Sequence, residues 1–191
     1  MTEMEKKRLL TKEEYVILMS RFGYEKPVVK QVNYYYDTVD LSMNRQDITC
    51  RIRLKDGKYK GTIKSHSPDG CQSTESEIKV YDGIRKNEFT EIGLKHYGEL
   101  ITKRCIIFKD EGCEAVLDKN EYLGCVDFEL EIEYKPDFEH HAADVLRMLT
   151  DGIKSSKTIA TDNLINSNLS ARSKSKRFFE RYLIIERRKK C

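Results

Sequence analysis

An unbroken alternation of acidic and apolar side chains over residues 126–134 constrains the fold of this chain more than any other feature of the sequence. Successive side chains of a β-strand point to opposite faces of its sheet, so a strand here has one acidic face and one apolar face. The acidic face carries Asp127, Glu129, Glu131 and Glu133. Neighbouring like charges on a strand repel one another unless cations lie among them. The segment therefore predicts a strand whose acidic face meets basic groups or ions, with an isolated acidic face in water as the alternative.

A predicted hairpin supplies basic groups in the same alternating pattern. The strand-like segments Ile48–Lys55 and Lys58–Lys64 are joined by Asp56-Gly57, a pair typical of tight hairpin turns. One face of the hairpin is apolar, and the other carries Arg51, Arg53, Lys58, Lys60, Thr62 and Lys64. Such a basic face is either a solvated outer surface or the lining of a polar cavity.

The N-terminal segment, residues 2–9, presents the same choice. In a strand, Glu3, Glu5 and Lys7 would share one face. Taken alone, this segment is typical of a charged arm that joins no sheet. Basic and acidic faces elsewhere in the chain favour a strand that contributes to one common charged surface.

The other elements follow from apolar periodicity and from capping signals. Thr11 and Glu14 form a capping-box pattern, which predicts a helix that ends at Gly23. Further strands are predicted at Val28–Asp37, Thr74–Val80, Leu100–Lys109 and Cys113–Asn120. Further helices are predicted near Phe89–Tyr97 and at Glu139–Leu149 and Ala171–Lys190, and loops at Ser65–Gly70 and Asp151–Asn168.

Eight strands joined mostly by short connections can close an antiparallel barrel with space inside. If the apolar faces pack outward against the helices, the charged faces line the interior. We therefore predict an α+β fold, an eight-stranded antiparallel β-barrel with flanking helices. We expect one domain over residues 1–191, in which residues 170–191 form a C-terminal helix that closes on the barrel.

Composition limits the classes of partner. Charged residues make up 35% of the 191 residues, but acids and bases nearly cancel to a net charge of +3, which gives little support to a nucleic-acid surface. No apolar run approaches the length of a membrane span. The six cysteines lack metal-finger spacing and are typical of reduced thiols. We expect a soluble cytoplasmic protein with neither a nucleic acid nor a membrane as its partner.

The two kinds of charge point to one kind of ligand. Arginine and lysine suit an anion with several oxygens, phosphate in particular. Clustered carboxylates suit a hard divalent cation such as Mg²⁺ or Mn²⁺. A small molecule that carries a chain of phosphates with bound metal would satisfy both sets.

Several motifs in order along the chain carry a family resemblance. Glu3-Met4-Glu5-Lys6-Lys7 resembles the Glu-x-Glu-x-Lys signature of the CYTH domain, the triphosphate tunnel metalloenzyme superfamily. The further matches are Tyr35-Tyr36-Asp37-Thr38, Arg51-Ile52-Arg53, Lys64, Glu75, Arg104, Leu117-Asp118 and Glu129-Leu130-Glu131. Lys174-Ser175-Lys176-Arg177-Phe178-Phe179 is similar to the lysine-bearing C-terminal helix of small bacterial members, with Arg172 and Lys176 as alternatives to Lys174.

The resemblance implies a metal-dependent triphosphatase that removes the terminal phosphate of inorganic triphosphate or of a nucleoside triphosphate inside a charged tunnel. It implies one metal held by Glu3, Glu5 and Glu131. It implies a second metal placed by Glu75, Asp118 and Glu129. These three residues and Lys174 would be the catalytic residues. The substrate-binding residues would be Lys7, Arg51, Arg53, Lys64, Arg104 and Lys174.

Other readings stay open at this point. The same family resemblance also allows a class IV adenylate cyclase or a thiamine triphosphatase. The chain offers no convincing adenine pocket for the first, and it has no tryptophan to bind the thiamine rings for the second. A binding module that holds polyphosphate without hydrolysis is a third. Glu77 is either a neighbour of Glu75 at the site or a structural partner of an arginine. We interpret His140 and His141 as exposed helix residues, and Tyr34, Tyr35 and Tyr36 as sheet packing.

Overall fold

A computed structural model of the protein describes residues 2–66, 72–153 and 172–189, with the side chains of residues 2, 3, 66, 72 and 73 left out of the description. The greater part of the predicted loops Ser65–Gly70 and Asp151–Asn168 lies outside these ranges. So do Ala171 and Lys190, the predicted ends of the last helix.

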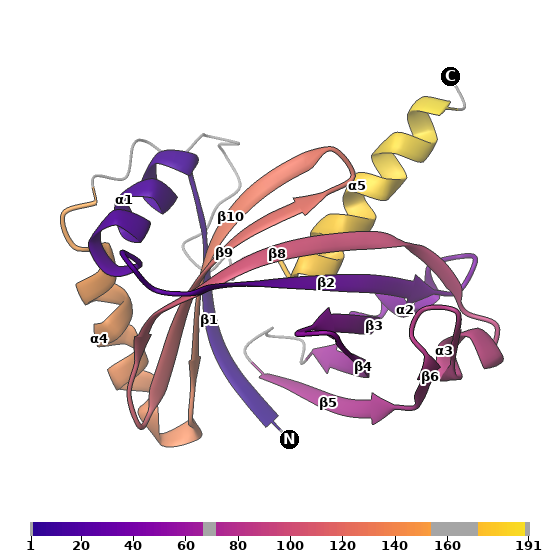
Figure 1. The fold of residues 1–191 in the computed structure, drawn as a ribbon, viewed down its shortest axis with the longest axis horizontal. Helices are drawn as coiled ribbons and strands as arrows, with labels where there is room; N and C mark the ends of the chain where they lie inside the picture. Colours follow the sequence, from indigo (N-terminus) through magenta and orange to yellow (C-terminus); the bar gives the residue numbers. More distant parts are fainter. Residues whose placement is uncertain (1, 67–71, 154–171, 190–191) are drawn as a thin grey trace.

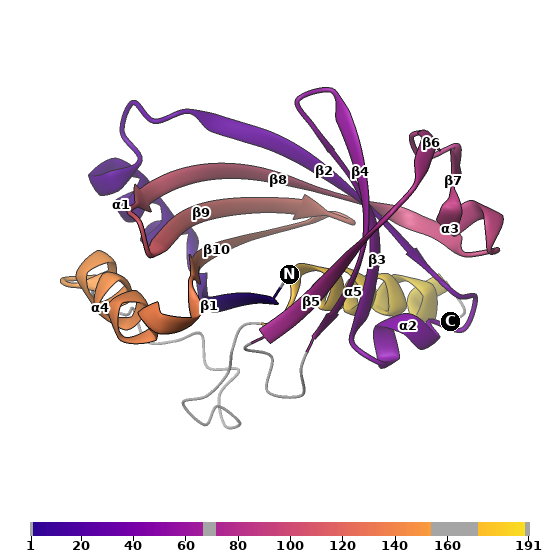
Figure 2. The same ribbon diagram turned by 90° about the horizontal axis from the view of Figure 1, so that it is seen from below.

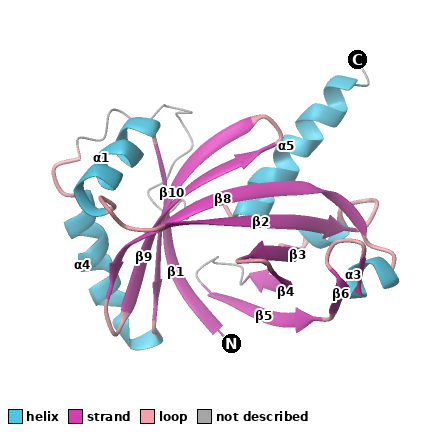
Figure 3. Ribbon diagram, in the orientation of Figure 1, coloured by secondary structure: helices cyan, strands magenta, loops and turns pink. Residues whose placement is uncertain are grey.

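Eight antiparallel strands form one sheet that closes into a barrel, as predicted (Figures 1 and 3). Their order around the barrel is β1-β10-β9-β8-β2-β3-β4-β5, and a short ladder between β1 and β5 closes it. The strands are β1 (Thr2–Leu10), β2 (Val28–Asp37), β3 (Ile48–Lys55), β4 (Lys58–His66), β5 (Gln72–Ile78), β8 (Lys95–Lys109), β9 (Cys113–Tyr122) and β10 (Cys125–Tyr134). A separate two-stranded sheet pairs β6 (Val80–Asp82) with β7 (Lys86–Asn87).

The helices flank the barrel. They are α1 (Lys12–Phe22), α2 (Ser42–Arg45), α3 (Glu88–Glu91), α4 (Glu139–Thr150) and α5 (Lys174–Lys189), with a 3₁₀ turn at Pro136–Phe138 before α4. The predicted capping box opens α1: Thr11 Oγ1 accepts from the Glu14 N–H at 3.1 Å, and Glu14 Oε2 accepts from the Thr11 N–H at 2.8 Å. Gly23 caps the C-terminal end of α1, which confirms this helix.

The helix predicted near Phe89–Tyr97 is wrong in its second half. Helix α3 ends at Glu91, and the chain turns through Gly93, whose φ of +81° lies in the left-handed region that favours glycine. From Lys95 onward the backbone pairs with β2, where Lys95 lies opposite Asp37. Strand pairing with a distant segment therefore overrides the local helical pattern.

The apolar faces of β9 and β10 point outward and are covered by helices. Leu130 and Ile132 of β10 are fully buried in a core that includes Leu18 of α1 and Val145 of α4. Figures 1 and 2 show α1 and α4 together at one end of the barrel. Since side chains alternate along a strand, this packing turns the charged faces of the same strands toward the barrel interior.

Helix α5 packs its first turns against the barrel and then extends away from it to the C-terminus (Figure 1). Phe178 and Phe179 are buried beside Tyr35 of β2 and Leu100 of β8. Within the described ranges, no helix combines the length and the apolar character that a membrane span requires.

Candidate functional site: a charged cavity inside the barrel

A cavity of about 220 Å³ lies inside the barrel and is closed on one side by the start of α5. Charged side chains dominate its lining. Seven are cationic, namely Lys7, Arg51, Arg53, Lys60, Lys64, Arg104 and Lys174, and four are carboxylates, namely Glu5, Glu75, Glu131 and Glu133. Positive charge is in excess, so the cavity suits a ligand with several negative charges.

The strand register brings these side chains together from distant parts of the sequence. Lys7 of β1 lies opposite Glu131 of β10, and Lys64 of β4 lies opposite Glu75 of β5. Directly opposed residues on one face of a sheet are near enough for their side chains to interact. The alternating charged faces predicted from the sequence thus become one continuous interior surface, and the cavity-lining interpretation of Arg51, Arg53 and Lys64 is confirmed over the solvated one.

Lys174, the first residue of α5, reaches the centre of the carboxylates. Its Nζ lies 2.8 Å from Oε1 of Glu131, 2.9 Å from Oδ2 of Asp118 and 3.1 Å from Oε2 of Glu129. Burial alone would lower the pKa of Lys174, but the three carboxylates outweigh burial and raise it. The ammonium is therefore charged at neutral pH.

The two alternatives to Lys174 point elsewhere. Arg172 pairs with Glu180 on α5 itself. Lys176 pairs with Asp47 at 2.6 Å. Neither Arg172 nor Lys176 lines the cavity. Of the three basic residues considered at the start of this helix, Lys174 is the one that enters the barrel.

Glu131 is the most heavily paired carboxylate of the cavity. It contacts Lys174, lies 3.5 Å from Nζ of Lys7 and accepts from Arg104. Burial by itself would raise the pKa of Glu131, but the charges of Lys174, Lys7 and Arg104 hold it well below its usual range.

Asp118 and Glu129 lie in the barrel wall behind these groups and are fully buried. Arg104 binds Asp118 in bidentate fashion, with distances of 2.9 Å and 2.7 Å. Arg177 donates to Oε2 of Glu129 at 2.7 Å. In contrast, no group in the described ranges donates a hydrogen bond to Oε1 of Glu129. A buried carboxylate oxygen of this kind is costly without a partner, and a cation would satisfy it.

Two of the three charged signature residues of β1, Glu5 and Lys7, have described side chains. Glu5 and Lys7 line the cavity, and Glu5 Oε1 lies 2.8 Å from Nζ of Lys7 and 3.9 Å from Nζ of Lys64. Burial would lower the pKa of Lys7, but Glu131 and Glu5 raise it. The backbone of Glu3 lies opposite Ser73, and its side chain is outside the described part of the structure.

The opposite wall of the cavity carries an arginine pair. Arg51 lies 3.2 Å from Oε2 of Glu75. Arg53 donates to Oδ1 of Asn33 at 3.0 Å, and among the described residues no carboxylate lies within ion-pair distance of it. The neighbouring charge of Arg51, together with burial and with Arg104, lowers the pKa of Arg53 to about 10. An anion bound here would relieve this repulsion.

Sequence reasoning missed several residues that line or support the site. The alternation places Glu133 on the acidic face, but no site role is predicted for it. Gln31 and Asn33 continue the phase of Tyr35, so the same alternation could have identified them. Arg177 lies about one helical turn after Lys174, which signals a shared helix face. In contrast, Glu77 is exposed and pairs with Lys60 at 2.7 Å, so it does not line the cavity.

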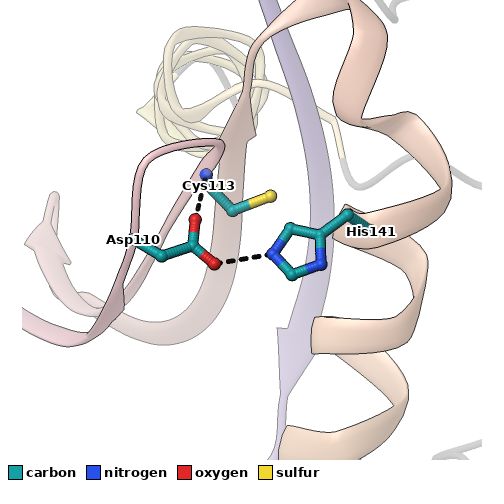
Figure 4. Close-up of side chains that lie close together, drawn as sticks. All are labelled: Asp110, Cys113 and His141. Atoms are coloured by element: carbon teal, nitrogen blue, oxygen red, sulfur yellow. Dashed lines mark hydrogen bonds and ion pairs between the residues drawn. The ribbon is translucent and has the colours of Figure 1, made fainter.

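A second group of polar side chains lies outside the cavity, where the β8–β9 turn meets α4 (Figure 4). Asp110 Oδ2 is 2.6 Å from Nε2 of His141, and its other oxygen accepts from the Gly112 and Cys113 N–H groups. The possible ligand atoms of Asp110, Cys113 and His141 lie within 4.8 Å of one another. The hydrogen bonds by themselves explain the arrangement as a link between the turn and α4. His140 is exposed as predicted. His141 also lies on α4, and its side chain is 43% exposed, although the contact with Asp110 covers part of the ring.

The predictions for the tyrosines and cysteines also have outcomes. The Tyr35 and Phe178 rings pack with centroids 5.0 Å apart, and Tyr36 packs on Phe89 at 5.2 Å, which confirms sheet packing for both. The cysteines that the structure describes, Cys50, Cys105, Cys113 and Cys125, are all free thiols.

The architecture defines a class of protein, an antiparallel barrel built around a charged cavity. The sequence model of the CYTH domain matches residues 1–161, and the chain belongs to the CYTH domain family. The resemblance carried by the motifs is thereby confirmed.

Named relatives agree with this assignment. The Bacillus subtilis (strain 168) protein named "Putative triphosphatase YjbK" is 30% identical over 146 residues, which cover 69% of this chain and 76% of that protein. Among solved structures, a "putative adenylate cyclase" from Bacillus halodurans has a TM-score of 0.66 at 24% identity, with 93% of this chain and 97% of that chain covered. HpAC1 from Hippeastrum, a "putative adenylyl cyclase" described as having a dominant triphosphatase activity, has a TM-score of 0.59 at 19% identity, with 78% and 86% covered.

Proposed function

We propose that this protein is a metal-dependent triphosphatase, which hydrolyses the terminal phosphate of a triphosphate compound inside the barrel. The observation that carries the proposal is the lining of the cavity, where seven cationic side chains and four carboxylates face one common space. The name of the B. subtilis relative and the activity described for HpAC1 support the same reaction.

The carboxylates fit a hard divalent cation, Mg²⁺ or Mn²⁺. Glu5 and Glu131 line the cavity, and Asp118 and Glu129 present further oxygens from the adjoining wall. Oε1 of Glu129, which accepts no hydrogen bond from the described residues, fits such a cation as a ligand atom. Carboxylate oxygens are the ligands that such ions prefer. A bound divalent ion would neutralise charge on phosphate oxygens and lower the pKa of a water molecule.

The cationic residues would hold the substrate. Arg51 and Arg53 offer planar donor groups that match phosphate oxygens, and Lys64 adds a point charge on the neighbouring strand. Phosphoryl transfer depends mainly on positioning and on neutralisation of charge, and side chains fixed on paired strands provide both. Lys7 and Arg104 keep Glu131 ionised.

Glu75 is our candidate for the group that accepts the proton of the attacking water. It lines the cavity, and its Oε2 lies 3.2 Å from the guanidinium of Arg51, so the carboxylate is held at the edge of the space where a water molecule could lie. Asp118 and Glu129, which the family resemblance also places in catalysis, would act from the wall through Lys174 and the cation.

The lining favours inorganic triphosphate over a nucleotide. Among the described lining residues, Tyr35 is the single aromatic side chain, and it is 1% exposed. A base or a thiamine ring binds best on an exposed aromatic or apolar surface. The polar wall of this cavity offers phosphate contacts in place of such a surface.

Phosphate release from inorganic triphosphate, ATP and thiamine triphosphate, with Mg²⁺ or Mn²⁺ and with a chelator, tests the proposal. We expect turnover of inorganic triphosphate in the presence of metal and loss of turnover with the chelator. Cyclic AMP formed from ATP would indicate a cyclase instead. Binding of all three compounds without turnover would indicate a non-catalytic module.

A further inference from the structure

The ammonium of Lys174 occupies the position where three carboxylates converge. Asp118, Glu129 and Glu131, here called the carboxylate cluster, come from two neighbouring strands, β9 and β10. All three contact the same nitrogen at 2.8 to 3.1 Å. Each carboxylate also has an arginine partner, which is Arg104 or Arg177. Lys174 is therefore the cation that the three groups share.

The oxygens around Lys174 belong to the groups that a divalent cation would use. Two cations cannot share one position, because they repel each other and compete for the same lone pairs. An ammonium also satisfies the cluster incompletely, since Oε1 of Glu129 accepts no hydrogen bond from any described residue. The carboxylate cluster could therefore offer one more oxygen ligand to a cation with a higher charge.

We propose that Lys174 and a divalent cation occupy the carboxylate cluster alternately, so that metal binding displaces the ammonium toward the cavity. The inference rests on the metal assignment of the proposed function and adds an exchange of cations to it. The displaced ammonium would then lie nearer to the space where phosphates bind. Metal and triphosphate would therefore bind cooperatively, because the phosphate oxygens replace the carboxylates that Lys174 gives up.

The position of Lys174 in the fold suits such an exchange. It is the first residue of α5, so its side chain can change rotamer without breaking the helix. The following residue stays anchored, because the Ser175 hydroxyl is 2.6 Å from the Thr49 hydroxyl of β3. Lys174, Ser173 and Ser175 all line the cavity, which gives the displaced side chain a polar destination.

Calorimetric titration of Mn²⁺ alone into the full chain, at pH 7.5 and without any phosphate compound, tests the exchange. We expect Lys174→Met to bind Mn²⁺ more tightly than wild type, by roughly tenfold, within the usual range for coupling between two ligands. Lys176→Met is the matched control, since it removes the same charge from the opposite face of the same turn of α5, where the partner is Asp47 outside the cavity. Its affinity for Mn²⁺ should equal that of wild type.

Three outcomes would overturn the exchange. Equal or weaker Mn²⁺ binding by Lys174→Met, with tight binding by wild type, removes the exchange and leaves the triphosphatase proposal intact. A similar gain in Mn²⁺ affinity for Lys176→Met would show that the change in net charge alone explains the effect. No Mn²⁺ binding by any of the proteins removes both the exchange and the metal part of the proposed function.

A measurement on the wild-type protein covers the case in which Lys174→Met does not fold. Amine-specific labelling read by mass spectrometry reports how accessible each lysine is. We expect saturating Mn²⁺ to increase labelling of Lys174 several-fold and to leave Lys176 unchanged. Labelling of Lys174 that stays constant or falls would contradict the proposal.

Discussion

In the middle of β10, at residues 129–132, the two faces of the strand are buried to a similar extent, yet they place opposite demands on their surroundings. Leu130 and Ile132 on the outer face are fully buried in an apolar core beneath α1 and α4. Glu129 and Glu131 on the inner face are 0% and 4% exposed and are surrounded by lysine and arginine. Equal burial therefore identifies neither a core nor a site.

The chemistry of the partners makes the difference. Apolar burial stabilises the fold without regard to direction, in proportion to the area removed from water. Buried charges contribute little net stability, and they are costly when a partner is missing. The outer face is thus a scaffold, and the inner face lines the charged cavity in which we propose that the substrate binds.

The outer face should dominate stability. We expect Ile132→Ala to lower the free energy of unfolding by about 2 to 5 kcal/mol, because it leaves a cavity in a closed core. Urea unfolding measures the change. The rate of phosphate release per folded molecule should stay close to the wild-type value. A lower rate in protein that is fully folded would show that the two faces are not separable.

The inner face should dominate binding. Arg53→Ala should weaken binding of inorganic triphosphate by about 2 to 5 kcal/mol, since it removes a charge in the cavity wall that forms no ion pair with a described carboxylate. Arg147→Ala serves as the control because Arg147 is exposed on α4, pairs with Asp144 at 3.0 Å and does not line the cavity. Equal losses in the two variants, measured by calorimetry, would contradict the special position of Arg53.

The inner face should also set the acid sensitivity of the fold. The pKa of Glu131 is well below its usual range in the folded protein, so its stabilising contribution is present above the ordinary glutamate pKa. That contribution is lost as the pH falls toward the folded value. Urea unfolding from pH 7 to pH 3 should show a steeper loss of stability in wild type than in Glu131→Gln. Parallel curves would argue against the assigned charge state.

The smallest effect is expected at the edge of the scaffold. Thr11→Ala removes the cap of α1 and should cost about 1 kcal/mol of unfolding free energy. Thermal unfolding detects a change of this size. Because α1 lies on the outer side of the barrel, the affinity for triphosphate should not change, and a loss of affinity would show that the helix shapes the cavity.

The contrast between the faces also explains what could be predicted from the sequence. Charged and apolar side chains alternate with a period of two residues along β1, β3, β4 and β10. The charged interior and residues such as Arg51, Lys64 and Glu131 could therefore be inferred. The boundary between α3 and β8 could not, because pairing with β2 decides it. The entry of Lys174 in place of Lys176 depends on how α5 meets the barrel, which no local pattern encodes.

The most direct measurement compares neighbouring residues on the two faces of β10. Phosphate release from inorganic triphosphate with Mn²⁺ is measured for wild type, Glu131→Gln and Ile132→Ala, and each rate is divided by the folded fraction from circular dichroism. We expect Glu131→Gln to lose roughly a hundredfold or more of the rate, the scale of a removed electrostatic contact, while Ile132→Ala retains it. A wild-type rate in Glu131→Gln would contradict the assignment of the inner face as the site of chemistry.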